Sequence, residues 1–406
     1  MDRNLILVRK WSCCGRRIKV LGVHDLLHAF CVNEAQKENL LHVVRENGSD
    51  FPQRCFRWLS IQSSNFDVST LSYSSRSCRS IFCFPECTSL NLEQFKLLRV
   101  FFFISWEMYH NIVDLVHLRY LPPRLEGENI IELFKAWNLH TLHTSADDMI
   151  NYLEFPQLQY FSCDSITGHP PKFVHQNLQS LSWLKPKHCT KKFFRRVPNV
   201  KKIRICGELK KCNDCIKNLV SLQQLERLYI CANIRSYKSP NMIEINSQIV
   251  LLKSLRRLQL RRNCFEWNGI NVLCKLPRLE VLKVSRACVG KEWELPEDDK
   301  FCQLIVLQIG GTDLKDWKAT GDHFPKLEHL SLFWCEKLKE IPSGFAEISR
   351  LKSIQLRGCL PSVVASAQEI KEEQFDYLNN IVDVDVVVAE QHGYSLVVSE
   401  SESYEA

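Results

Sequence analysis

The sequence predicts an α/β solenoid of stacked short repeats, preceded by a separate N-terminal segment and followed by an acidic tail. First, an apolar pattern, L-x-x-L-x-L, recurs at intervals of 19 to 30 residues between Leu98 and Leu351. Second, the stretch before this pattern reads as a hairpin and a helix instead of a repeat. Third, the part from Ser362 onward holds one Lys and ten acidic residues, although the whole chain has a net charge of +7.

The recurring pattern with this spacing is the signature of leucine-rich repeats. Its last two apolar positions alternate on a short strand, so both point inward, and its first position packs beneath them. No single repeat can bury its own apolar edge, so we expect the repeats to stack into one horseshoe-shaped solenoid. Two weaker copies, at Phe56 and Cys78, bring the number to about fourteen repeat units. The clear copies begin at Leu98, Leu118, Leu139, Leu158, Leu178, Val200, Leu225, Leu255, Leu279, Leu304, Leu327 and Leu351.

Small polar or thiol residues close several repeats, three positions after the last apolar residue of the strand. They are Asn233, Asn263, Cys335 and Cys359. We expect them to turn the chain and to bond backbone groups of the stack. The chain has 19 Cys, an odd number, and its first residues do not resemble a secretory leader. We therefore expect reduced thiols in an intracellular, cytoplasmic protein, with the membrane surface or the nucleus as further locations.

Between the inward positions, the strand residues of the middle repeats face the concave surface and are strongly basic. Cations and one aromatic side chain on a rigid face predict a binding surface for an acidic partner. Nucleic acid also binds such a face, but aromatic stacking residues are sparse here, so we expect a protein. No stretch approaches the roughly 18 apolar residues of a membrane span. The predicted partner-binding residues are Lys202, Arg204, Arg227, Tyr229, Arg257, Arg261 and Lys283.

The N-terminal segment reads as two strands, Leu5–Val8 and Ile18–Leu21, and a helix from about Asp25 to Val44. His24 and Asp25 stand together at the start of this helix. A catalytic dyad would need a nucleophile, and no G-x-S-x-G motif occurs. We expect Asp25 to be the N-cap of the helix.

Other motifs carry little chemistry. Cys212 and Cys215 form a C-x-x-C pair, but no second pair lies at the spacing that zinc sites use, so we expect no metal. No phosphate-binding G-x-x-x-x-G-K-[ST] occurs. After the repeats, Ala365 to Asn379 is helix-prone, and Val382–Val388 resembles a strand.

The order of these parts resembles the C-terminal portion of plant intracellular immune receptors of the nucleotide-binding, leucine-rich-repeat (NB-ARC) class. The stretches DRNLILV, VHDLLHAFCVNEAQKENLLHVV and FRWLSI are most similar to coiled-coil-type late blight resistance proteins. The resemblance covers essentially the whole chain. Repeats alone are unspecific, whereas VHDLL directly before them is a specific signal.

The resemblance implies three regions. Residues 1–48 would close a winged-helix subdomain of the nucleotide-binding module, residues 49–361 would form the leucine-rich-repeat solenoid, and residues 362–406 an acidic cap or tail. The family's Met-His-Asp motif falls on Val23, His24 and Asp25. His24 would then approach the phosphates of bound ADP, and Asp25 would fix the local backbone.

The phosphate-binding loop and the catalytic carboxylates of that module lie outside this chain. We therefore expect no cofactor on the chain alone, and ADP or ATP only where the nucleotide-binding module is supplied. The chain would be a fragment, or it would act with another chain.

Two functions follow. The first is that of a partial immune receptor in plant defence, whose repeats recognise a pathogen effector or a guarded host protein and restrain an ADP/ATP switch. The second is a stand-alone interaction adaptor, such as a substrate receptor of a ubiquitin ligase. The adaptor would need an F-box-like helical segment before the repeats, where the sequence has a hairpin and one helix. No constellation of residues predicts an enzyme.

Overall fold

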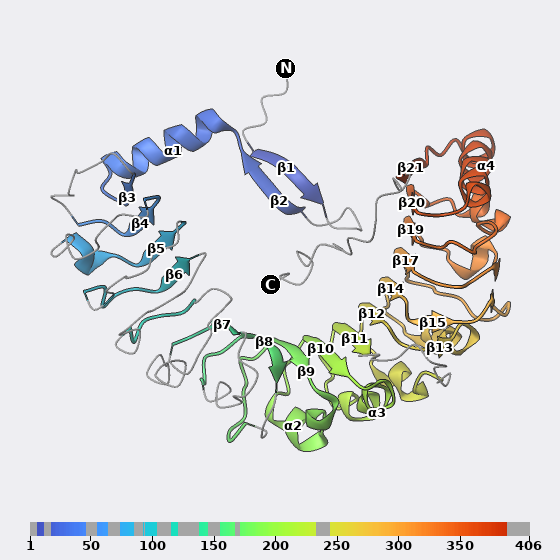
Figure 1. Cartoon of the computed structure of the whole chain (residues 1–406), viewed down its shortest axis with the longest axis horizontal. Helices are drawn as coiled ribbons and strands as arrows, with labels where there is room; N and C mark the ends of the chain where they lie inside the picture. Colours follow the sequence, from blue (N-terminus) through green and yellow to red (C-terminus); the bar gives the residue numbers. More distant parts are fainter. Residues whose placement is uncertain are drawn as a thin grey trace. The chain divides into compact units, whose positions relative to one another are not determined.

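The computed structural model divides into two compact bodies. The N-terminal body comprises residues 1–184 and 195–200, and the C-terminal body comprises residues 185–194 and 201–406. Figure 1 shows the helices and strands with their labels. The structure describes residues 6–11, 18–45, 55–63, 74–84, 92, 94–103, 115–120, 138–144, 155–166, 171–232 and 244–387.

The N-terminal body begins with the predicted hairpin, which is confirmed. β1 (Ile6–Trp11) and β2 (Ile18–Val23) pair antiparallel, with Ile6 opposite Val23. Helix α1 (Asp25–Lys37) follows β2 directly (Figure 1). The predicted turn between the strands and the boundary at residues 48 and 49 lie outside the described residues.

The prediction that this helix continues to Val44 is wrong. Helix α1 ends at Lys37, and Asn39 adopts a left-handed backbone conformation with a φ of 53°, which a continuing helix does not allow. Leu41–Val44 then forms β3, whose residues pair with Trp58–Ile61. A short apolar run fits a helix and a strand equally well, and here pairing with a neighbouring repeat decides.

The repeats of the N-terminal body place their strands side by side in parallel. β3, β4 (Trp58–Ile61), β5 (Ser80–Cys83) and β6 (Val100–Phe103) form one sheet. Tyr120 makes isolated bridges to Val100 and Thr141, and β7 (Thr141–Thr144), β8 (Tyr160–Ile166) and β9 (Ser180–Leu184) continue in parallel. A short 3-10 helix, η2, spans Ser74–Ser77.

Among the described residues of the C-terminal body, eight strands pair in parallel in the order of the sequence, within one sheet. They are β10 (Lys202–Gly207), β11 (Arg227–Ala232), β12 (Arg257–Arg261), β14 (Val281–Ser285), β17 (Val306–Gly310), β19 (His329–Phe333), β20 (Ser353–Arg357) and β21 (Asp383–Val387).

Short helices and small strand pairs lie between these strands. The helices are α3 (Leu209–Leu219), η7 (Ser247–Leu251), η8 (Asn268–Lys275), η9 (Gly321–His323), η10 (Ser343–Glu347) and α4 (Pro361–Leu378). η6 (Pro186–His188) and α2 (Lys191–Arg196) precede β10. β13 (Phe265–Glu266) pairs with β15 (Cys288–Val289), and β16 (Glu292–Glu294) with β18 (Asp316–Lys318).

The predicted inward positions form the core. In the repeat that begins at Leu225, the residues Leu225, Leu228 and Ile230 are all buried, and the same holds for Leu255, Leu258 and Leu260 in the next. Burying a Leu or Ile side chain stabilises the fold by about 1.5–3 kcal/mol. The protein is thus a leucine-rich-repeat solenoid with long parallel strand pairing, as the sequence predicts.

Aromatic rings form a second core layer behind the strands of the C-terminal body. The indoles of Trp267, Trp293 and Trp317 stack in series, with ring centroids 5.0 and 5.2 Å apart. Phe345 meets Trp317 edge-on at 5.0 Å. The buried indole N–H of Trp293 donates to Asn271 Oδ1 at 2.9 Å. Each ring comes from a successive repeat, so the ladder ties four repeats together.

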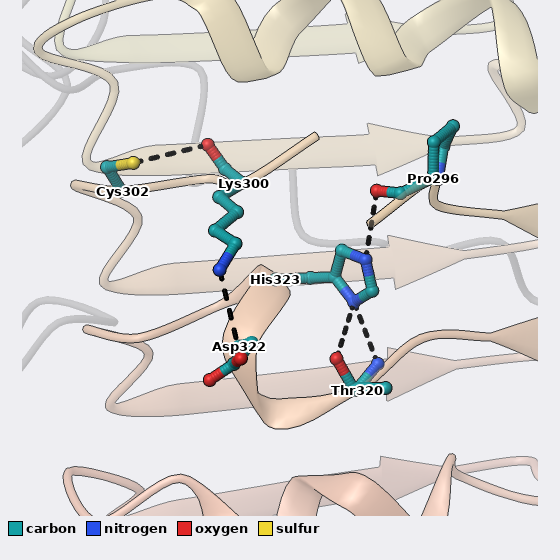
Figure 2. Close-up of polar contacts among 6 residues, drawn as sticks. All are labelled: Pro296, Lys300, Cys302, Thr320, Asp322 and His323. Atoms are coloured by element: carbon teal, nitrogen blue, oxygen red, sulfur yellow. Dashed lines mark hydrogen bonds and ion pairs between the residues drawn. The ribbon is translucent and has the colours of Figure 1, made fainter. Parts of the chain in front are cut away.

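Polar side chains link successive repeats in the same way. Figure 2 shows His323 between two chain segments, where its Nδ1 accepts from the Thr320 N–H at 2.9 Å and its Nε2 faces the Pro296 carbonyl at 3.1 Å. The accepting Nδ1 fixes the proton on Nε2, which donates to Pro296. This buried imidazole therefore closes one loop and holds it against the preceding repeat.

The turn residues follow the prediction only in part. Cys335 and Cys359 donate to carbonyls of the preceding repeat, Ile309 at 3.8 Å and Leu332 at 3.4 Å, as expected. Asn263 is buried, but neither its side-chain oxygen nor its nitrogen has a hydrogen-bond partner, so the expectation is wrong there. Asn233 lies outside the described residues.

The C-terminal helix and strand complete the stack. α4 buries Val363, Ala367 and Ile370 against the last repeats, and its buried Gln374 donates to the carbonyls of Phe345 and Ile348 at 3.3 and 2.8 Å. β21 then pairs in parallel with β20, which confirms the strand predicted within Val382–Val388. Residues 361–387 thus cover the end of the repeat core.

Candidate functional site: a basic strand face

The seven predicted partner-binding residues lie on four neighbouring strands of the C-terminal body, β10, β11, β12 and β14. We call this set the basic face: Lys202, Arg204, Arg227, Tyr229, Arg257, Arg261 and Lys283. Pairing along these strands is without bulges. Their side chains therefore form regular rows across the sheet.

The register defines the rows. Lys202, Arg227 and Arg257 are successive partners in the first row. Arg204, Tyr229, Gln259 and Lys283 form the second row, and Cys206, Cys231 and Arg261 the third. Row partners on parallel strands lie about 4.8 Å apart, so like charges in the first row are close neighbours.

Alternation along each strand puts the basic face on the opposite side of the sheet from the core. Ile203 and Ile205 in β10 are fully buried, whereas Lys202 and Arg204 between them are half-buried. Lysine and arginine side chains of this intermediate exposure commonly pack their aliphatic stems on the protein surface. The face is therefore pre-ordered.

Tyr229 and Arg261 make the centre of the face. Arg261 and Cys231 both act on the Tyr229 phenol, and Arg261 opposes the rise of its pKa. Burial raises the pKa of Tyr229 to about 12, with the nearby Cys231 acting in the same direction. The phenol is therefore neutral at physiological pH. The sequence pointed to Tyr229 and Arg261, but it did not place Cys206 and Cys231 on this face, where the strand register puts them in one row with Arg261.

The charge of the strand face changes along the C-terminal body. Beyond β14, the first and second rows carry neutral or weakly basic residues such as Gln308, His329 and Ser331, whereas the third row carries Arg357 on β20. At β21 the first and second rows end in Asp383 and Asp385, both exposed. From the sequence, these two carboxylates are expected in a strand of the acidic cap or tail, and their place at the end of the rows follows from the strand register.

His24 and Asp25 occupy the junction between β2 and α1 in the N-terminal body. The expectation that Asp25 caps the helix is wrong. The N-cap is His24, whose Nδ1 accepts the Leu26 N–H at 3.2 Å, and Asp25 is the first helical residue. A carboxylate in the first turn stabilises the helix through its favourable interaction with the helix dipole. Both side chains are exposed, so these two residues alone do not enclose a nucleotide.

The C-x-x-C pair lies in α3 and is buried. The Cys212 thiol donates to the Cys231 carbonyl at 3.8 Å, and the Cys215 thiol to the Lys211 carbonyl at 3.0 Å. Among the residues that the structure describes, no three His, Cys, Asp or Glu side chains are grouped so that they could hold a metal ion. None of the described helices has the length and apolar character to cross a membrane.

No family model matches the sequence. The late blight resistance protein homolog R1B-16 of Solanum demissum is 27% identical over 93% of this chain, and homolog R1B-23 of the same species is 26% identical over 98%. The chain is homologous to late blight resistance proteins.

The matched region is a limited part of these late blight resistance proteins. The chain spans about a third of their length, 31% for R1B-16 and 34% for R1B-23. The similarity extends over the N-terminal hairpin and helix as well as the repeats, because it covers nearly the whole chain.

Two solved structures with likeness to this chain are as follows. The crystal structure of the TLR13–ssRNA13 complex matches over 82% of this chain and 54% of that chain, with a TM-score of 0.45 and 16% identity. A leucine-rich-repeat protein of Leptospira interrogans matches over 80% of this chain and 93% of that chain, with a TM-score of 0.29 and 12% identity.

Proposed function

We propose that this chain is the recognition region of a plant disease-resistance receptor, and that its basic face binds an acidic surface of a protein partner. The partner would be a pathogen effector or a guarded host protein. The homology to late blight resistance proteins supports the receptor class, and the basic face on β10–β14 is the single observation that supports the mode of binding.

The physical argument is charge complementarity on a rigid support. Six cations lie in neighbouring rows on strands whose other side is fixed in the core. Such a face attracts an acidic partner at a distance and selects it over neutral or basic surfaces. Because the side chains are already half-ordered, binding loses less rotamer entropy than it would on a flexible loop.

The N-terminal hairpin and α1 support a second contact, with the nucleotide-binding module of the same receptor family. Ile6, Leu21, Leu26 and Phe30 are exposed, with Leu26 at 76% and Phe30 at 61%, and α1 has no buried residue. Such a group of exposed apolar residues marks an interaction surface. With the module in place, His24 and Asp25 would contact ADP or ATP, and the repeats would restrain the switch. The chain itself would have no catalytic role.

Association in trans tests this proposal. The chain is co-expressed with the upstream portion of the late blight resistance protein homolog R1B-16, and co-purification is measured. We expect a complex that is lost in the double variant Leu26→Asp/Phe30→Asp. The matched control is Phe375→Asp/Tyr377→Asp, which changes two exposed aromatic residues of α4 (58% and 84% exposed) and should leave the complex intact. No complex with the parent chain, or equal loss in both variants, refutes the contact.

The basic face is tested separately. Pull-down from infected leaf of Solanum demissum with the parent chain is compared with Lys202→Glu/Arg204→Glu/Arg227→Glu. The control, Lys253→Glu/Lys275→Glu/Arg278→Glu, makes the same charge change on exposed residues outside the strands. We expect an acidic protein retained by the parent and the control but lost from the face variant. Recovery of ubiquitin-ligase scaffold subunits by all three chains would favour the adaptor function instead.

A further inference from the structure

Two cysteines lie side by side on the strand face, next to the basic face. Cys206 in β10 and Cys231 in β11 are register partners, so their side chains leave the sheet on the same side. Both are partly accessible to solvent. Neighbouring parallel strands are about 4.8 Å apart, within the Cα separation of roughly 4.4–6.8 Å that a disulfide spans.

The surroundings of Cys231 favour the thiolate. A hydrogen bond with Cys206 lowers the pKa of Cys231 to about 6, with the Tyr229 hydroxyl and the charges of Arg261 and Arg262 acting in the same direction against burial. The pKa of Cys206 is raised, first by its hydrogen bond with Cys231 and then by burial. One sulfur is therefore a nucleophile and the other keeps its proton, an arrangement typical of reactive cysteine pairs.

Several other described thiols differ from this pair in burial or in pKa. Burial raises the pKa of Cys212 to about 12. Cys335 and Cys359 also form a pair, and a hydrogen bond with Cys335 lowers the pKa of Cys359 to about 7, but Cys335 is fully buried, whereas Cys206 and Cys231 are both partly accessible. Cys302 is exposed, and its thiol is directed at the Lys300 carbonyl (Figure 2).

We propose that Cys231 and Cys206 are a peroxide-sensitive modification site, in which Cys231 is the attacking and Cys206 the resolving thiol. The Cys231 thiolate attacks one oxygen of a hydroperoxide, so an S–O bond forms while the O–O bond breaks. The departing oxygen takes up a proton and leaves as water or an alcohol. The Cys206 sulfur then attacks the Cys231 sulfenic acid, the S–S bond forms, and the hydroxide leaves as water with the Cys206 proton. The peroxide is reduced by two electrons, and the two thiols are oxidised to one disulfide.

The full chain treated with increasing ratios of hydrogen peroxide tests the site. Remaining thiols are blocked with N-ethylmaleimide, and the digest is analysed without reduction by mass spectrometry. We expect the peptide cross-linked between Cys206 and Cys231 to appear before exposed Cys31 or Cys302 is oxidised. The same chain in urea should lose this preference. Oxidation of Cys31 or Cys302 first, or no Cys206–Cys231 cross-link, overturns the proposal.

Single variants separate the two roles. In Cys206→Ser, the Cys231 sulfenic acid should persist and be trapped by dimedone, whereas Cys231→Ser should give no adduct at Cys206. Arg261→Gln should slow alkylation of Cys231 by iodoacetamide several-fold at neutral pH. Cys302→Ser is the matched control and should form the cross-link as the parent does. A Cys231 in the Cys206→Ser chain that reacts no faster than Cys302 also overturns the proposal.

Discussion

Replacing Trp293 by alanine removes the centre of the aromatic ladder and tests whether that ladder holds the C-terminal repeats together. Trp293 is fully buried and stacks on Trp267 and Trp317, at interplanar angles of 28° and 8°. Truncating a buried Trp costs about 3–5 kcal/mol, and each lost aromatic pair adds about 0.5–1.5 kcal/mol. Relaxation of the cavity recovers part of this sum, so we expect a loss of about 5 kcal/mol.

The variant Trp293→Phe separates the contribution of the Trp293–Asn271 hydrogen bond from that of ring packing. Trp293→Phe keeps a ring between its neighbours but leaves Asn271 Oδ1 without the indole donor, at a cost of about 1–3 kcal/mol. Combined with Asn271→Ala, the two changes should show a coupling of about 1 kcal/mol. The assay is equilibrium unfolding in urea, followed by far-UV circular dichroism because tryptophan fluorescence is itself altered. A Trp293→Ala chain that unfolds within about 1 kcal/mol of the parent refutes the ladder as a core element.

Three further predictions address single features. His323→Ala should lower the free energy of unfolding by about 1–3 kcal/mol, since it leaves the Pro296 carbonyl and the Thr320 N–H unpaired. Asp322→Asn, which affects only an exposed ion pair, should change the melting temperature little. Gln374→Ala should lower the melting temperature, because it removes two buried hydrogen bonds and with them about 1–3 kcal/mol of the free energy of unfolding. Deleting residues 362–406 should lower the melting temperature and the solubility. An unchanged melting temperature in both variants would show that α4 does not cap the stack. Iodoacetamide should alkylate Cys231 at a half-maximal rate near pH 6, since the thiolate forms above its pKa of about 6, whereas an ordinary thiol reaches that point near about pH 8.5; a midpoint above about pH 8 contradicts the shift.

Most of the fold could be predicted because the repeat pattern reports burial directly. Leu228 and Ile230 point inward because side chains alternate between the two faces of a strand, and the same alternation applies to the equivalent residues of the other repeats. Helix α1 shows where the pattern is insufficient. Leu41–Val44 satisfies either periodicity, and only a neighbouring strand, distant in sequence, decides between them.

Part of the candidate site could likewise be predicted from the sequence, and part depends on the strand register. The cations of the basic face could be listed from the sequence, because strand alternation assigns each of them to the solvent side. The relation between Cys206 and Cys231 could not, because it depends on the register between two strands separated by α3. Likewise, the His24 cap depends on a backbone conformation, with a φ of −61° and a ψ of 137°, that residue type alone does not fix.

The unbroken register from β10 to β21 gives the strand face a direction as well as a charge. Each row begins or continues with cations near β10–β12, and two of the rows end in carboxylates at Asp383 and Asp385. An elongated partner with an acidic and a basic end would match these rows in one orientation. The reversed orientation would bring like charges together at both ends, which costs binding energy. The strand face of the C-terminal body would therefore favour one of the two orientations of such a partner.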